Sequence, residues 1–526
     1  MSPFEAPKPD GRRYYMLAIY CLLSLSNSTN WVSFAPISDQ ASQYFGDIGD
    51  DYVNFLALIW SILYGPGSVL GIFWFQKYKL RDTLILGGAF TVAGCLVRLI
   101  AALLRDALGG RGTYALFFIG QALIGMGQPI LVNLATAMSS TWFPLEERDR
   151  ATTIATVFNP LGNAVGQILP PMIVFNGSNG DDDDSTDYRD IKGMNMLMIV
   201  EFFLALVPLL MAIAFFKAQP DVPPSFSEAN RDNALHAEVG ALGSLGPADR
   251  GSLTRRSSTG SISSSVPVVQ DNTCSYERAV AEFKQLIGNK QYVLLLTSFS
   301  IGLGLCNSVL TLIFQLVDPY GYSNNEAGFF GFILIVTGMV GAALMAVLLE
   351  RTRAYRTFYS YGFIFAFFAV SFFTVMLFSN NYTMLAFSFA LMGFGIVPLF
   401  PACLENVVEC TYPISEDMSV GLLLTSGNVV TVIVTLLLSA TLNTGHYGPP
   451  PFTYSNAFIW FVLLSATIVA FLYKGDNKRL AADMAHHHRN EDVNDKVLAD
   501  QGEMLNEPLL ARVESDGTSN LDRAAI

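Results

Sequence analysis

The side chains best suited to bind a small molecule are five residues inside long apolar segments. These residues are Trp31, Asn27, Asn159, Asn307 and Asn428. A buried amide needs a hydrogen-bond partner, so each asparagine either connects two helices or faces a bound ligand. An indole ring can hold an organic cation against its face. We therefore predict that these residues bind a substrate, with interhelical packing as the alternative role for each.

Two carboxylates, Glu405 and Glu409, are spaced one helical turn apart at the end of an apolar segment. Paired carboxylates can act as a general acid and base, but a loop expected on the same side contains Arg353. We therefore interpret the pair as an ion-pair gate between helices, with a plain charged surface as the alternative. Glu147 and Arg81 are the expected counterpart in the first half of the chain.

No pattern in the sequence indicates catalysis. Six cysteines are scattered without the paired spacing of a disulfide framework or a zinc site. The sequence also contains no nucleophile beside a base and no phosphate-binding loop. We therefore expect no enzymatic activity, no metal site and no cofactor.

The elements that position the candidate residues are predicted to be membrane-spanning helices. Only 14% of the 526 residues are charged and 52% are hydrophobic, whereas about 25% of the residues in a soluble protein are charged. Apolar segments of about 20 residues are long enough to cross a bilayer. Twelve are expected, at 14–36, 52–75, 82–104, 113–139, 151–175, 194–216, 291–317, 326–349, 356–378, 383–404, 418–442 and 454–473. The net charge of −13 disfavours nucleic acid as a partner.

The charges also predict the orientation. Most of the 31 Lys and Arg residues fall on the side of both termini, which the positive-inside rule places in the cytosol. The sequons at Asn176 and Asn381 fall on the other side, where glycosylation is possible. The expected organisation is a cytosolic N-terminus at 1–13, a six-helix bundle at 14–217, a disordered cytosolic linker at 218–290, a second six-helix bundle at 291–474 and a disordered cytosolic tail at 475–526.

The two halves repeat each other. One constant offset superimposes Pro129 on Pro398, Glu147 on Glu416 and Asn159 on Asn428, and a nearby offset pairs Asn27-Ser28 with Asn307-Ser308. Two parallel halves of six spans resemble the major facilitator superfamily. The predicted fold is therefore an all-α membrane protein with twelve transmembrane helices in two pseudo-symmetric bundles, which rock around a site near the midplane.

Several motifs resemble one family within that superfamily, the feline leukaemia virus subgroup C receptor-related (FLVCR-like) solute carriers. They are NSTNW at 27–31, TWF at 141–143, PP at 170–171, EAG at 326–328 and TYP at 411–413. The resemblance implies facilitated transport of choline or ethanolamine. Haem and vitamin B6 (pyridoxine) are the other substrates that it implies.

The resemblance also implies where a quaternary ammonium group would bind. Choline carriers of this family place it between a Trp of the first span and a Tyr of the seventh. Trp31 matches the Trp, but Asn307 stands at the position of the Tyr, and Pro160 stands where the family has a Gln. Asn428 matches a further family Gln. The expected substrate is therefore a choline- or ethanolamine-like amine or a similar neutral or cationic metabolite.

Ionisable residues are rare within the spans. Arg98 is expected to snorkel to the membrane surface, and Glu201 is expected near the outer end of its span. Without a central carboxylate or histidine we expect facilitated diffusion that is not coupled to protons, and without a central cation we expect no anionic substrate. The expected partners are a small-molecule substrate and the lipid bilayer, for a monomer in the plasma membrane or the vacuolar or lysosomal membrane. A non-transporting receptor or scaffold is the alternative function.

Overall fold

The computed structural model describes residues 10–175, 186–220, 282–352, 354–379, 381–411, 414, 416–443 and 453–475, and all regular structure in this part of the chain is helical. Most of the expected linker and tail, the sequon at Asn176 and the gate residue Arg353 lie outside the described residues. The first half contains α1 (Arg13–Thr29), η1 (Ala35–Ile37), α2 (Ser38–Tyr44), α3 (Asp50–Leu103), α4 (Arg105–Trp142), α5 (Leu145–Phe175) and α6 (Thr186–Phe215). The second half contains α9 (Lys290–Thr311), α10 (Ile313–Val317), η3 (Asp318–Tyr320), α11 (Asn324–Thr352), α12 (Tyr355–Met376), α13 (Tyr382–Ile396), α14 (Leu399–Thr411), α15 (Glu416–Asn443) and α16 (Tyr454–Leu472).

These helices form the twelve spans predicted from the apolar segments. Ten stretches in the described part are long and apolar enough to cross a membrane. Helix α3 contains two of them, joined near Lys79, whose φ of 61° turns the chain back. Helices α13 and α14 together form one span. Helices α1 and α5 complete the twelve spans of the fold.

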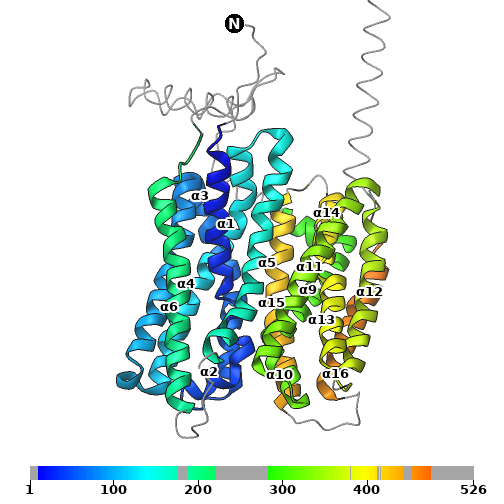
Figure 1. Ribbon diagram of the computed structural model, residues 1–526. Helices are drawn as coiled ribbons and strands as arrows, with labels where there is room; N and C mark the ends of the chain where they lie inside the picture. Colours follow the sequence, from blue (N-terminus) through cyan, green and yellow to red (C-terminus); the bar gives the residue numbers. More distant parts are fainter. Residues whose placement is uncertain are drawn as a thin grey trace, which may run out of the picture.

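The spans form two bundles that lie side by side, with α1 to α6 in one and α9 to α16 in the other (Figure 1). Helix α5 packs against α11 and α3 packs against α15 across the interface between the bundles. We call the side on which α1 begins the terminal side. The side with α2 and α10 is called the opposite side.

The first span is broken, which the apolar pattern did not predict. Helix α1 ends at Thr29, and residues Asn30–Phe34 are buried but not helical. The Asn30 side chain donates to the Ser26 carbonyl over 2.7 Å, so a polar group satisfies part of the helix end in place of the next turn. The seventh span is interrupted more briefly, at the single residue Leu312 between α9 and α10.

Helix α5 approaches the end of α1 closely because two of its residues have no Cβ. A Cβ at Gly162 would overlap Ser28 and the backbone of Leu25, and a Cβ at Gly166 would overlap the backbone of Thr29. The two glycines lie one turn apart on a single face of α5. They hold α5 directly against the last turn of α1, immediately before the break.

Candidate substrate site

A cavity of about 580 Å³ lies between the two bundles. Its walls come from α1, α3, α4 and α5 on one side and from α9, α11, α12, α13, α14 and α15 on the other. It extends towards the terminal side as far as Thr153, Ala346 and Leu404. Among the described residues that line it, none is Asp, Glu, Lys, Arg or His. A cavity of this kind suits a neutral or weakly hydrated cationic ligand better than an anion.

Four of the five residues predicted to bind substrate line this cavity. They are Trp31, Asn159, Asn307 and Asn428. Two of the amides have a hydrogen-bond partner within their own bundle, because Asn307 donates to Thr431 Oγ1 over 3.3 Å and Asn428 donates to the Leu424 carbonyl over 2.9 Å. The structure thus brings residues from three helices, α5, α9 and α15, and from the non-helical segment after α1 to one chamber.

The fifth predicted residue, Asn27, does not line the cavity. Its amide nitrogen donates to Thr91 Oγ1 over 2.8 Å and to the Ile124 carbonyl over 3.1 Å, and the side chain is fully buried. Asn27 therefore connects α1 to α3 and α4 inside the first bundle. The predicted role of Asn27 in substrate binding is therefore corrected to interhelical packing, because Asn27 lies on the face of α1 that points into the first bundle.

Sequence reasoning did not identify Asn163 and Ser24 as lining residues of the cavity. Four lining residues each have one buried side-chain polar atom without a hydrogen-bond partner in the described part of the chain, namely Asn163 Oδ1, Trp60 Nε1, Ser24 Oγ and Asn159 Nδ2. Asn159 and Asn163 lie one turn apart on α5, so an amide donor and an amide acceptor are available on one face. The spacing of these two asparagines was the signal in the sequence.

Aromatic rings form much of the remaining wall on the side of the first bundle. Trp31 is 8% exposed and lies in the non-helical segment after α1, while Trp60 and Tyr64 are one turn apart on α3. Trp31 also borders a small pocket on its other side, together with Phe34, Asn54 and other residues. Trp31 therefore separates the cavity from the opposite side of the protein.

Hydrogen bonds between the bundles close the opposite side. Asn324, the first residue of α11, donates to the Pro36 carbonyl over 3.1 Å, to Asp39 over 2.6 Å and to Gln40 over 2.8 Å. Burial raises the pKa of Asp39, nearby Asp318 raises it further, and the amide of Asn324 opposes the shift. Deeper in the interface, Gln167 of α5 donates to the Leu310 carbonyl over 3.0 Å. The protein is therefore closed on the opposite side.

The predicted gate pairs are only partly visible. Glu147 pairs with Arg13 over 3.1 Å and accepts a hydrogen bond from Tyr14, whereas Arg81 donates to the Ile213 carbonyl. The predicted partner of Glu147 is thus corrected from Arg81 to Arg13, and the pair lies within the first bundle.

The second predicted gate pair consists of two carboxylates in different environments. Glu405 is exposed and Glu409 is buried, although both lie on α14.

The sequon residue Asn381 is exposed and caps α13 by accepting a hydrogen bond from the Met384 amide over 3.2 Å.

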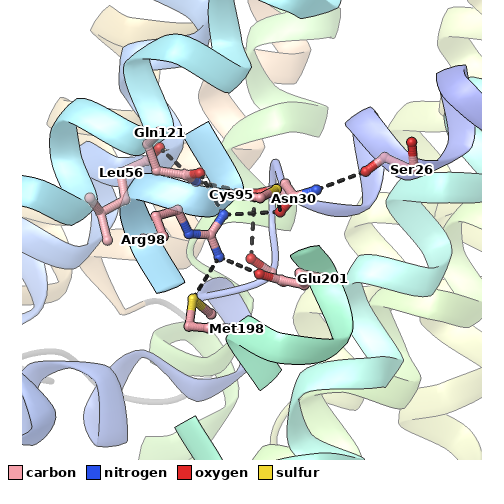
Figure 2. Close-up of polar contacts among 9 residues, drawn as sticks. Ser26, Asn30, Leu56, Cys95, Arg98, Gln121, Met198 and Glu201 are labelled. Carbon is pink, nitrogen blue, oxygen red and sulfur yellow. Dashed lines mark hydrogen bonds and ion pairs between the residues drawn. The ribbon is translucent and has the colours of Figure 1, made fainter. Parts of the chain in front are cut away.

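The structure corrects the prediction for Arg98. Its side chain does not reach the membrane surface but is fully buried, where it donates to Glu201 of α6 (Figure 2). Distance to the end of the span suggested snorkelling, but a carboxylate on another helix of the same bundle pairs with the guanidinium instead.

The comparisons with known proteins agree with this architecture. A model of the Major Facilitator Superfamily matches residues 16–407. The chain is 26% identical over 499 residues to solute carrier family 49 member A3 of Xenopus tropicalis, and the match covers 92% of this chain and 91% of that protein. It is 27% identical over 481 residues to the choline/ethanolamine transporter FLVCR1 of Felis catus, with 91% and 75% covered.

A solved structure shares the fold. The partially occluded inward-open conformation of the xylose transporter XylE from E. coli aligns with a TM-score of 0.61 at 12% identity, covering 89% of this chain and 99% of that one. Since the family model covers more than half of the sequence, and both bundles, the internal repeat and the central cavity agree with it, the chain belongs to the major facilitator superfamily as an FLVCR-like solute carrier.

Proposed function

We propose that this protein carries a small organic amine of the choline or ethanolamine type across a membrane by alternating access. The observation that carries the proposal is the cavity between the bundles, which is lined by aromatic rings and amides and, among its described residues, by no charged side chain. The face of an aromatic ring attracts a quaternary ammonium group by about 0.5–2 kcal/mol. Such a cation needs no carboxylate to bind.

The two ends of the substrate are assigned to different wall residues. Trp31, with Tyr64 nearby in the wall, holds the cationic end. The amide side chains of Asn159 and Asn163, which line the cavity, bind a hydroxyl, with one donating and the other accepting a hydrogen bond. Asn307 and Asn428 contact the substrate from the second bundle.

Transport proceeds as facilitated diffusion without obligatory proton coupling. The closed opposite side and the cavity that extends towards the terminal side give an inward-facing state, provided that both termini lie in the cytosol. Glu405 and Glu409 contribute to a gate on the terminal side, together with Arg353.

Asn381 on the other side accepts a glycan, as does Asn176. The membrane is the plasma membrane or the vacuolar or lysosomal membrane, and one chain forms the whole cavity, which supports a monomer.

A second candidate substrate is pyridoxine. Trp31, Trp60 and Tyr64 offer several aromatic surfaces in one chamber, and the asparagine side chains of the wall suit the hydroxyl groups of a flat ring. Haem is less well supported, because its iron favours a histidine ligand and no described lining residue is a histidine. The relatives and the fold are those of transporters, so we propose transport and not catalysis.

Uptake into proteoliposomes tests the proposal. Labelled choline, ethanolamine, pyridoxine and haem are compared side by side, with Trp31→Ala as the matched variant. We expect uptake of choline or ethanolamine that saturates and that Trp31→Ala weakens. Uptake of pyridoxine alone would establish the second candidate. If no compound is taken up and none raises the melting temperature of the purified protein, a receptor or scaffold function replaces the proposal.

A further inference from the structure

The residues behind Trp31 form a buried polar network that the cavity does not reach. It contains Asn30, Arg98, Gln121 and Glu201, and none of these lines the cavity. The side chains of Arg98 and Glu201 are 0% and 2% exposed. Arg98 comes from the second part of α3, Gln121 from α4 and Glu201 from α6, so three helices converge on the break after α1 (Figure 2).

Arg98 contacts the non-helical segment on both sides of Trp31. One nitrogen, Nη1, donates to Asn30 Oδ1 over 3.0 Å, immediately before Trp31 in the chain. The guanidinium also lies 4.9 Å from the ring centroid of Phe34, three residues after Trp31. A single rigid cation therefore fixes both ends of the short segment that presents the indole ring.

Gln121 completes the support of this segment. Its amide nitrogen donates to the Asn30 carbonyl over 3.1 Å, and its amide oxygen accepts from Arg98 over 2.9 Å. The Asn30 carbonyl can no longer accept from a following helical turn, because α1 has ended at Thr29. The network thus supplies to the broken backbone what a continuing helix would have supplied.

A buried ion pair is a costly way to obtain stability alone. Apolar side chains of similar volume often give equal or greater stability, because the desolvation of two charges offsets much of their attraction. The planar guanidinium, however, fixes geometry in several directions at once, which an apolar side chain does not do. The value of the pair therefore lies in the position of what it contacts.

We propose that Arg98, Glu201 and Gln121 are positioning residues that fix the Asn30–Phe34 segment so that Trp31 presents its ring to the substrate. The inference rests on the proposed function in one respect, namely that Trp31 contacts the substrate. Glu201 acts by holding Arg98, and Arg98 acts through Asn30 and Phe34.

The decisive variant is the double substitution Arg98→Met with Glu201→Leu. It removes both charges and keeps the volume, so it avoids the unpaired buried charge that a single substitution would leave. Arg98→Lys is the second variant, because it keeps the charge but loses the planar fork. Thr91→Val is the control. Thr91 lies on the same helix as Arg98 and does not contact the segment, and its replacement removes a buried hydrogen bond that it accepts from Asn27.

Two measurements are made on the full chain. The first is hydrogen–deuterium exchange of the peptide that covers residues 30–37 in the substrate-free protein. The second is uptake of labelled choline, separated into apparent KM and maximal rate. Both are measured for each variant alone and in combination with Trp31→Ala, and thermal unfolding establishes that each variant is folded.

We expect the double variant and Arg98→Lys to exchange faster in residues 30–37, with Thr91→Val unchanged there. Their KM for choline should rise roughly tenfold, close to the effect of Trp31→Ala, because that is the size of a lost cation–π contact. In the Trp31→Ala background they should add no further rise.

Unchanged exchange in residues 30–37 of the folded double variant would overturn the inference, and so would KM effects that add to those of Trp31→Ala. Failure of the proposed function has a different signature. In that case Trp31→Ala does not alter choline uptake, or no variant takes up choline, while the exchange measurement still decides whether the network fixes the segment.

Discussion

Asn54 and Gln315 exchange two hydrogen bonds across the interface between the bundles. Nδ2 of Asn54 donates to Oε1 of Gln315 over 3.2 Å, and Nε2 of Gln315 donates to Oδ1 of Asn54 over 3.0 Å. Asn54 also contacts Ser439 of α15, which in turn donates to Asp51 over 2.6 Å. These contacts must break before the opposite side can open, so they contribute to the balance between the two states of a rocking carrier.

The Asn54–Gln315 pair should therefore control access from the opposite side. Replacing both residues with leucine removes two hydrogen bonds, worth about 1–3 kcal/mol together, and shifts the population towards the open form by roughly tenfold. The shift can be measured as faster maleimide labelling of a cysteine introduced at Thr311, which lies in the small pocket beside Trp31. Asn133→Leu, which removes a hydrogen bond from the Asn133 side chain to the Ser68 hydroxyl within one bundle, is the control. Equal labelling in all three proteins would contradict the prediction.

The contact between Asp39 and Asn324 should make this closure sensitive to pH. Burial raises the pKa of Asp39 in the closed state, and exposure to water on opening returns it towards its usual value. The closed state therefore binds the proton more tightly, is favoured at low pH, and loses this advantage as the pH rises through the raised pKa.

Because the thiolate is the reactive form and becomes more abundant as the pH rises, the labelling rate of each protein is divided by the rate of the same protein in denaturant at the same pH. The expected result is a lower normalised rate for the same cysteine at about pH 5 than at about pH 7.5. Asp39→Asn keeps an acceptor for Asn324 but cannot ionise, so its labelling rate should not respond to pH. A wild-type rate that is constant over this range, or an Asp39→Asn variant that responds as the wild type does, would refute the role of this carboxyl group.

The amide pair on α5 should select for a hydroxyl group on the substrate. Replacing Asn159 and Asn163 with leucine leaves the aromatic wall in place and removes the proposed hydroxyl partners. Binding of choline should weaken by about 1–3 kcal/mol, whereas binding of ethyltrimethylammonium, which lacks the hydroxyl, should change little. Competition against labelled choline uptake measures both affinities. Equal losses for the two compounds would show that the asparagines do not contact the hydroxyl.

Uptake should not depend on a proton gradient. The described cavity wall offers no carboxylate or histidine, and the buried carboxylate of Glu201 is already paired with Arg98. In proteoliposomes, imposing or collapsing a pH gradient should leave the final accumulation of choline at its equilibrium level. Accumulation that follows the gradient and disappears in Glu201→Gln would establish proton coupling and displace the facilitated-diffusion mechanism.

The global fold could be predicted because membrane insertion imposes a simple rule on sequence. Each span needs a long apolar segment, and the repeat between the halves is visible in residues such as Asn159 and Asn428. Three of the four predicted asparagines line the cavity for the same reason, since a polar side chain in an apolar span must face the interior.

Contacts between distant segments could not be predicted. Asn27 and Asn159 have the same side chain at similar depth, but only the direction of each helix face decides which one meets the cavity. The pairing of Arg98 with Glu201 depends on how α3 packs against α6. The partner of Glu147 proved to be Arg13, which lies at the very start of α1, outside the loops in which gate residues were sought.

The close approach of α5 to α1 bears on which half of the protein would carry the proposed substrate. Gly162 and Gly166 leave no gap between α5 and the last turn of α1, so the two helices pack as one unit. In the proposed function, a ligand held between Trp31 and Asn163 would therefore stay with the first bundle while the second bundle rocks. The position of the second bundle would then determine from which side of the membrane that ligand exchanges with solution.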